Sequence, residues 1–538
     1  MRGQDRIRLW LAGPAADARW LAGDPLLASV RKFGAAVILA AGPWLVSVAA
    51  LAIISVTMTP AMGFAAVEDL RLTVVYAFCI APLVAGPIGA VAARRISAAL
   101  DGGETAPVAE IFLAAAALSG AGAQIIAIAI SLCLGIGPSG VAAGFVFLST
   151  VAALLWTSFA VLAAVYSYAF LIAAFTGGMI LSVACALLAA IHEPTTELLI
   201  WSFAVGVSLC VILSMRHVQK RFPCEFETFV PTFIGLLRQL RANLALCAGV
   251  FFAICGVWID KWVFWFGPEG ARSAAGFLHS SSYDSVMFFA HLSVIPTYAA
   301  LLVFHHGELL AIIERFRSSI EARSTYGLIR DRLDKLEESV WSGVFTIAFV
   351  QAAVTIGLVL MAPLLAKILD LSFGQFLMLR VGLIAVFFHA VIFLCCALLL
   401  VANRLRHFAL IQAIFLLLNF GLSLILHATI GMSAYAFLIS SLLGSTAAFY
   451  AAYRAIHSYD YNLFLGENDS LFQNDSASFR LILSQLNSKL CALSFNLKRS
   501  LRRFVHPQVE NKGQKFKQSI SWSYRQQDNK GDTINPAG

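Results

Sequence analysis

Twelve separate stretches of about twenty consecutive, mostly apolar residues run through this chain of 538 residues. A helix of that length crosses the hydrocarbon core of a bilayer, which is roughly 30 Å thick. Because backbone polar groups find no water there, each stretch has to satisfy its own hydrogen bonds as a helix. The sequence therefore predicts an all-α integral membrane protein with about twelve transmembrane helices. The expected spans are 33–57, 72–93, 109–135, 141–165, 167–190, 198–215, 242–266, 284–304, 340–366, 380–402, 408–428 and 434–453.

The composition excludes a soluble protein. Hydrophobic residues make up 59% of the chain and charged residues 13%, whereas soluble domains carry about 25% charged residues. The net charge of +8 would suit nucleic acid, but the basic residues lie in loops and tails beside the spans, which indicates membrane topology. The ten cysteines form no C-x-x-C pair. We expect no nucleic-acid partner, no metal and no cofactor.

Lysine and arginine predict the orientation, since short cytoplasmic loops carry an excess of both. Six precede the first span, five lie in 216–241 and six in 305–339, whereas the alternate loops have at most two each. We therefore expect a multi-pass protein with both termini in the cytoplasm. The first span is too long for a signal-peptide core and no small-residue cleavage site follows it, so we interpret it as an uncleaved anchor.

The basic segment 216–241 divides the spans into two sets of six. The predicted organisation is a cytoplasmic N-terminal segment 1–32, a first six-helix bundle 33–215, a basic cytoplasmic linker 216–241, a second six-helix bundle 242–453 with a cytoplasmic amphipathic helix at 308–338, and a polar cytoplasmic tail 454–538 with an amphipathic basic helix at about 479–505.

Prolines recur inside the spans of both halves. Pro43, Pro87 and Pro296 are candidates for helix kinks. Paired, Pro-broken helices in corresponding positions of two halves point to a transporter's central site, because freed backbone carbonyls can meet a polar ligand there. The alternative is that proline is simply commoner in membrane helices.

The densest local signal is a run of aromatic and charged residues at the outer end of the seventh span. On a helix Trp258, Trp262 and Trp265 share one face, Asp260 points nearly opposite, and Lys261 lies beside the tryptophans. One interpretation is an aromatic belt at the headgroups with a snorkelling lysine. The other is a sugar site, in which apolar sugar faces stack on the rings and hydroxyls bond to the charged pair.

Ionisable side chains inside the spans are rare, and those that are retained usually mark function. No carboxylate is expected near the middle of any span, which argues against a carboxylate relay. The ionisable groups at depth are His291, His389 and His427. Each is more often a packed, hydrogen-bonded residue than a proton carrier.

Four short pieces of the chain resemble one protein family. They are, in order, Ala-Gly-Pro-Trp at 41–44, Ala-Gly-Pro at 85–87, Trp-Ile-Asp-Lys-Trp at 258–262, and Tyr-Asp at 283–284. Their order and spacing, from about residue 30 to 460, are similar to those of the Pel exopolysaccharide exporter family (PelG). The resemblance marks Trp258, Asp260, Lys261, Trp262, Tyr283 and Asp284 as substrate-path candidates.

The resemblance also implies a fold and a function. The family belongs to the multidrug/oligosaccharidyl-lipid/polysaccharide (MOP) exporter superfamily, in which two six-helix bundles surround a central cavity. We therefore expect a MATE-like transporter in a bacterial inner membrane that exports an N-acetylhexosamine-rich polymer for a biofilm matrix. The implied partners are the polysaccharide, membrane lipid, a cytoplasmic glycosyltransferase and a membrane-bound cyclic-di-GMP receptor.

Both ends of the chain depart from the family pattern. The N-terminal segment 1–30 is longer than the N-terminal segment typical of the family, and the tail after about 460 is not typical of the family. The leucine spacing in the tail fits a helix on the anionic inner leaflet or a partner-binding face. The helix at 308–338 fits a dock for a cytoplasmic synthase or a helix at the interface.

The sequence gives no sign of an enzyme. It has no G-x-x-x-x-G-K-[ST] phosphate loop and no Asp-x-Asp pair for a metal-bound sugar nucleotide. Catalysis would have to come from a partner. Beside exopolysaccharide export, two alternatives remain: a lipid-linked oligosaccharide flippase or small-molecule exporter of the same superfamily, and a membrane scaffold that recruits a glycosyltransferase without transport.

Overall fold

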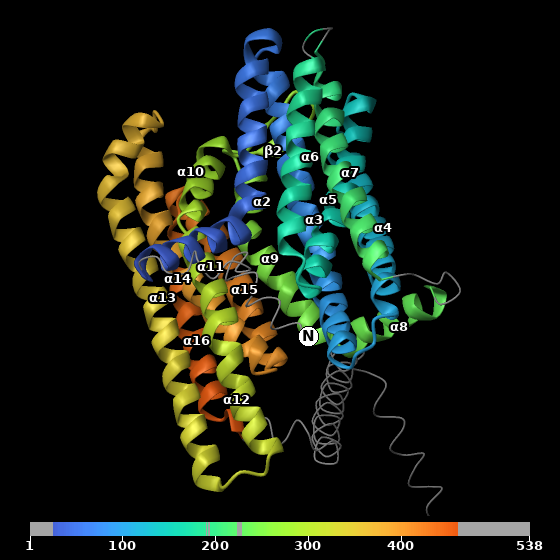
Figure 1. Ribbon diagram of the computed structural model, residues 1–538. Coiled ribbons are helices and arrows are strands. Elements are labelled where there is room, and N and C mark those ends of the chain that lie inside the picture. Colours follow the sequence, from blue (N-terminus) through green and yellow to red (C-terminus); the bar gives the residue numbers. More distant parts are fainter. Residues whose placement is uncertain (1–24, 190, 192–193, 223–228, 461–538) are drawn as a thin grey trace, which may run out of the picture. The chain divides into compact units, whose positions relative to one another are not determined.

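The computed structural model describes residues 25–189, 191, 194–222 and 229–460, and nearly all of them are helical (Figure 1). Within these residues, twelve helical segments are long and apolar enough to cross a membrane. This confirms the number of spans that the apolar stretches predict. The predicted tail helix at about 479–505 and most of the segment 1–32 lie outside the described residues.

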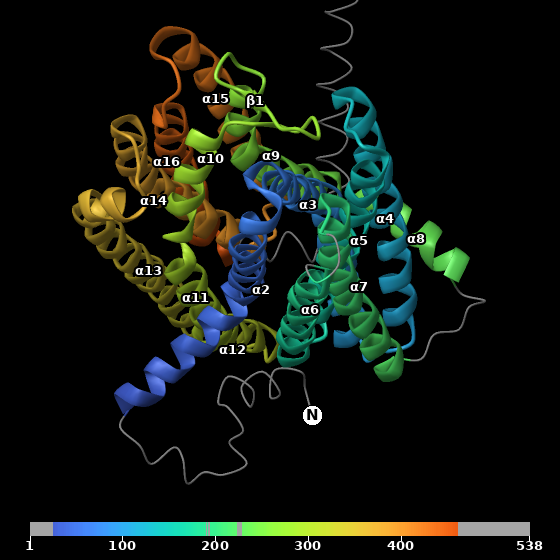
Figure 2. The same cartoon turned by 90° about the horizontal axis from the view of Figure 1, so that it is seen from above.

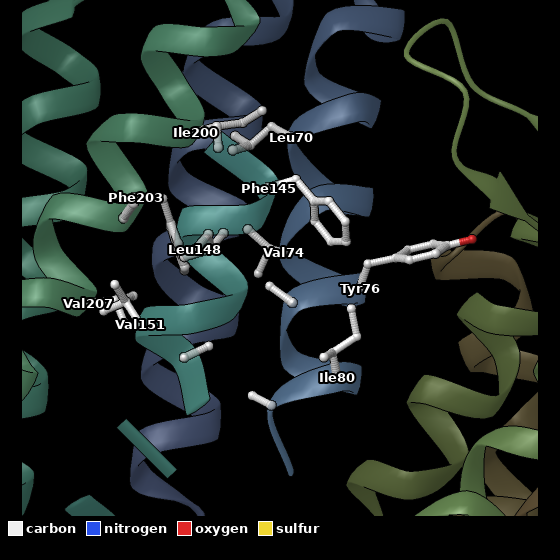
Figure 3. Close-up of a cluster of buried hydrophobic side chains, with 14 of the residues drawn as sticks. Leu70, Val74, Tyr76, Ile80, Phe145, Leu148, Val151, Ile200, Phe203 and Val207 are labelled. Carbon is white, nitrogen blue, oxygen red and sulfur yellow. The ribbon is translucent and has the colours of Figure 1, made fainter. Parts of the chain in front are cut away.

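The first bundle is built around α5. Helices α3, α4 and α7 pack on α5, and α7 also packs on α6. Aliphatic and aromatic side chains of α3, α5 and α7 interlock in its core, among them Val74, Leu148 and Phe203 (Figure 3). The helices are α2 (Pro25–Met62), α3 (Phe64–Asp101), α4 (Pro107–Leu134), α5 (Ser139–Ala164), α6 (Tyr168–Ala189) and α7 (Thr196–Arg221).

The second bundle contains two extensive helix pairs, α9 with α15 and α14 with α16. Glycines bring α9 close to α15, because a Cβ atom at Gly256 would lie 2.7 Å from the ring of Phe415. The helices are α9 (Leu244–Trp265), α10 (Ser281–Leu292), α11 (Ile295–Phe304), α13 (Tyr326–Ile368), α14 (Phe373–Val401), α15 (Leu405–Ile430) and α16 (Tyr435–His457).

The first and eighth spans are not single straight helices. The first span lies within the long helix α2, which includes the predicted range 33–57 and whose ribbon changes direction (Figure 2). The eighth span is two helices, because α10 ends at Leu292 and α11 begins at Ile295. The apolar pattern of the eighth span does not predict a break of only two residues.

Helices also continue beyond the apolar spans. The predicted amphipathic helix 308–338 is instead a π-helical turn (His305–Leu309), the helix α12 (Leu310–Glu321) and the first part of α13, which continues without interruption into the ninth span. Its apolar stripe is buried, including Phe316, Leu333 and Leu336. Within the linker 216–241, α7 continues to Arg221 and α8 spans Phe229–Ala242.

Candidate functional site

Helix α9 lies at the junction of the two bundles, since it packs on α15 of its own bundle and on α3 of the first. Trp258, Trp262 and Trp265 all pack against the core of the first bundle, which confirms that they share one face. Figure 3 shows the ring of Tyr76 extending away from α3, the helix to which it belongs. The ring stacks on Trp265, with ring centroids 4.9 Å apart. We call these four residues the aromatic seam.

The seam lies deep along α3. Tyr76 follows Phe64, the first residue of α3, by twelve positions, which corresponds to about 18 Å at 1.5 Å per residue. The end of α9 therefore meets the interior part of α3 and not its end. Along this face the tryptophans thus contact protein of the first bundle.

Asp260 lies on the other side of α9, inside the second bundle, with no exposed surface. The hydroxyl of Tyr283 donates a 2.6 Å hydrogen bond to Asp260 Oδ2, and Lys261 Nζ lies 3.4 Å from Oδ1. The same ammonium donates to the carbonyl of Val257 at 2.9 Å and lies 5.8 Å from the ring of Trp258. Lys261 is only 8% exposed, so it is held by these partners and does not snorkel.

Asp284, in the first turn of α10, connects that helix to the seam. Trp265 Nε1 donates to Asp284 Oδ2 at 2.8 Å, and the backbone N–H of Ser280 donates to the same oxygen at 3.1 Å. Asp284 Oδ1 is buried and makes no hydrogen bond with the described residues. A buried carboxylate oxygen without a donor retains its full capacity to accept one. The structure thus brings the six predicted substrate-path residues together around the α9–α10 pair.

The connection from α9 to α10 fastens the second bundle to the first. It contains a two-stranded antiparallel hairpin, β1 (Ala271–Arg272) with β2 (Leu278–His279). The buried Asp69 of α3 accepts a hydrogen bond from the backbone N–H of Ala275 at 3.1 Å. Tyr76 donates to the carbonyl of Leu278 at 2.7 Å. We call residues 266–280 the strap.

Sequence reasoning missed the strap and its anchors. A loop of fifteen residues carries no periodicity, and the only available signal was an acidic pair, Glu68 and Asp69, at the edge of an apolar span. In the structure, Glu68 Oε1 lies 3.4 Å from Nε2 of His279. Glu68 and Asp69 of α3 therefore connect the strap to the first bundle.

Two of the three predicted histidines lie near each other in the second bundle. His291 of α10 and His389 of α14 have ring centroids 6.3 Å apart, and Phe437 of α16 contacts both rings. His291 Nδ1 lies 2.7 Å from the carbonyl of Met287. His427 instead lies at the end of α15, where Nε2 is 3.2 Å from Glu269.

The three kink candidates have different surroundings. Pro296 is the second residue of α11, directly after the break in the eighth span. Pro43 and Pro87 lie inside α2 and α3, which continue past them. Next to Pro87, a Cβ atom at Gly86 would lie 2.8 Å from Ile254 of α9, so this glycine allows the close approach of the two bundles.

A groove of about 420 Å³ lies elsewhere, between α4 and α5. Gln124, Ser131 and Thr150 contribute its polar atoms, and the remaining lining residues are apolar. No residue of the seam or the strap lines it, so we place the candidate site at the α3–α9 junction, where charged and aromatic groups meet.

Comparison with known proteins gives a family and a fold. The model of the family described as "PelG: Putative exopolysaccharide Exporter (EPS-E)" matches residues 18–464. A comparison with curated protein sequences gave no match.

Solved structures of MATE transporters share the fold. An outward-facing multidrug resistance MATE transporter of the MOP superfamily aligns with a TM-score of 0.53 at 13% identity, over 82% of this chain and 97% of its own. An inward-facing one aligns with 0.53 at 12% identity, over 77% and 95%. The Vibrio cholerae MATE transporter VcmN, in a mutant form, aligns with 0.55 at 13% identity, over 82% and 99%.

Proposed function

Because this chain belongs to the PelG family of exopolysaccharide exporters, we propose that it exports an N-acetylhexosamine-rich polymer from the cytoplasm to the periplasm. In this proposal the protein lies in the inner membrane of a Gram-negative bacterium with both termini in the cytoplasm. A cytoplasmic glycosyltransferase makes the polymer, and a membrane-bound cyclic-di-GMP receptor belongs to the same complex. The exported polymer contributes to a biofilm matrix.

The observation that carries the proposal is the position of the aromatic seam between the two bundles. Trp258 and Trp262 are half-buried there. An indole ring combines an apolar face with an N–H donor, which suits the apolar faces and hydroxyl groups of a sugar. A polymer that passes between the bundles would meet these rings.

The polar residues behind the seam have a separate role in this proposal. Asp260, Lys261 and Tyr283 are joined to one another, so we assign them to holding α9 and α10 in position. Asp284 still has one carboxylate oxygen without a donor. We assign that oxygen to accepting a hydrogen bond from a sugar hydroxyl or acetamido N–H when the bundles part along the seam.

Deletion of the gene, followed by assay of the polymer outside and inside the cells, tests the proposal. We expect the extracellular polymer to disappear and the wild-type gene to restore it. Asp284→Asn and Trp258→Ala should fail to restore export at normal protein levels. The control is Asp334→Asn, which changes a carboxylate that is exposed and paired with Arg330 on α13; it should restore export fully.

Other outcomes separate the alternatives. Unchanged extracellular polymer after deletion would exclude polymer export, and a changed tolerance to small molecules would then support a small-molecule exporter. A scaffold without transport predicts that Asp284→Asn and Trp258→Ala export normally, while shortening of α12 and the first part of α13 abolishes polymer production.

A further inference from the structure

Helix α8 differs in placement from the membrane spans. It lies on the outside of the first bundle and runs crosswise to the spans (Figures 1 and 2). It packs on α4 and α3, and Thr232 and Leu236 are the buried residues of this contact face. One side of α8 is therefore fixed to the first bundle.

The opposite side of α8 is apolar and exposed. Val230, Ile234 and Leu237 are 62%, 44% and 36% exposed. Their spacing of four and three residues places them in one stripe. A short helix with an exposed apolar stripe and basic residues beside it typically lies in the interface of a bilayer. The exposed face of α8 is thus typical of a helix that lies in a membrane interface.

Three arginines lie in or beside this stripe. Arg241 continues it by one turn and Arg238 flanks it, and both are exposed. The guanidinium of Arg95, from α3, lies against α8 at Gly235, where a Cβ atom would be 3.1 Å from Arg95 Nη1. Gly235 and Arg238 are one turn apart, so Arg95 and Arg238 lie on neighbouring parts of α8. In the described part of the chain, no ion pair joins these three arginines to a carboxylate.

We propose that α8 and Arg95 form a binding site for an anionic glycerophospholipid. The lipid phosphate pairs with Arg95 and Arg238, because guanidinium groups bind phosphate oxygens in a bidentate manner. The acyl chains cover Val230, Ile234 and Leu237. A soluble phosphate would leave this stripe in water, and in a zwitterionic lipid the choline ammonium would offset the charge of the phosphate beside the arginines.

The bound lipid would hold the connection between the bundles at the membrane surface. Helix α8 ends at Ala242 and α9 begins at Leu244, so a lipid on α8 lies at the start of the helix that forms the seam. This proposal does not depend on the identity of the transported molecule, because it concerns only the surface of the linker.

Photo-crosslinking in lipid nanodiscs tests the site. The full chain carries a photoreactive amino acid at Ile234, and the nanodiscs contain equal amounts of phosphatidylglycerol and phosphatidylcholine. Mass spectrometry of the adducts should show mainly phosphatidylglycerol. Each basic residue near an anionic surface contributes about fivefold in binding, so Arg95→Gln/Arg238→Gln should lower the ratio of the two adducts by about 25-fold.

Two controls keep the test decisive. Arg330→Gln/Lys335→Gln, on the exposed part of α13, should leave the adduct ratio unchanged. If Arg95→Gln/Arg238→Gln is not monodisperse, Arg238→Gln/Arg241→Gln takes its place in the test, because it changes exposed side chains only. An equal yield of both lipids on the unsubstituted chain, or no lipid adduct at Ile234, would overturn the proposal.

Discussion

Removal of one member of the buried Asp260–Lys261 pair should cost more stability than removal of both. Asp260→Ala leaves the Lys261 ammonium and the Tyr283 hydroxyl buried without their acceptor. Breaking a buried ion pair in this way typically costs about 3–5 kcal/mol, whereas replacing both charges with apolar groups is often neutral. Asp260→Ala/Lys261→Met should therefore recover most of the loss.

The expected shift in melting temperature follows from the size of the folded unit. Unfolding entropy is about 2.1 cal/mol/K per residue, which gives about 1 kcal/mol/K for the described residues between 25 and 460. Asp260→Ala should lower the apparent melting temperature in detergent by about 3–5 °C. The matched control is Asp331→Ala, which breaks a 2.7 Å pair with Lys335 in which both side chains are more than half exposed; it should cost less than about 1 kcal/mol.

Thermal stability measured by size-exclusion chromatography of the heated protein provides the readout, and extracellular polymer provides a second one. A double variant that is as unstable as Asp260→Ala would refute the reasoning, because the loss could not then come from an uncompensated Lys261. A double variant that is stable and still exports polymer would show that the pair has no part in transport.

Three further substitutions test contacts between distant parts of the chain. Tyr76→Phe removes the bond to the Leu278 carbonyl and should cost about 1 kcal/mol, with faster hydrogen exchange in residues 266–280; unchanged exchange would argue against an anchoring role. Thr297→Val leaves the buried Gln351 without its 2.6 Å partner and should cost about 1–3 kcal/mol, measured by melting temperature. Gly256→Val inserts a side chain where α9 meets α15 and should reduce the yield of monodisperse protein, whereas Gly357→Val, which meets no neighbouring atom, should not.

The fold follows closely from the sequence because twelve apolar stretches leave few alternatives in a bilayer. The shared face of Trp258, Trp262 and Trp265 also follows from helical spacing. Helical spacing does not predict what this face contacts, since an aromatic face can pack on lipid or on another helix. Gly86 carried that information, because it allows α9 to approach α3, but glycine is common in membrane helices.

The strap was beyond prediction for a different reason. Its contacts join residues about 200 positions apart, as in the bonds from Asp69 to Ala275 and from Tyr76 to Leu278. Local patterns contain no signal for such pairs. By contrast, the i,i+4 pair of Asp331 and Lys335 depends only on local spacing, and the structure contains it.

The continuity of α13 has a mechanical consequence. Its 43 residues form one helix, about 65 Å long at 1.5 Å per residue, and its first turns pack against α12 beyond the apolar span. Because α13 is one continuous helix, a protein that tilts α12 and the first part of α13 would also displace the other end of α13 at Ile368. Motion of a partner at one side of the membrane would thus reach the opposite side without any change in the side chains between them.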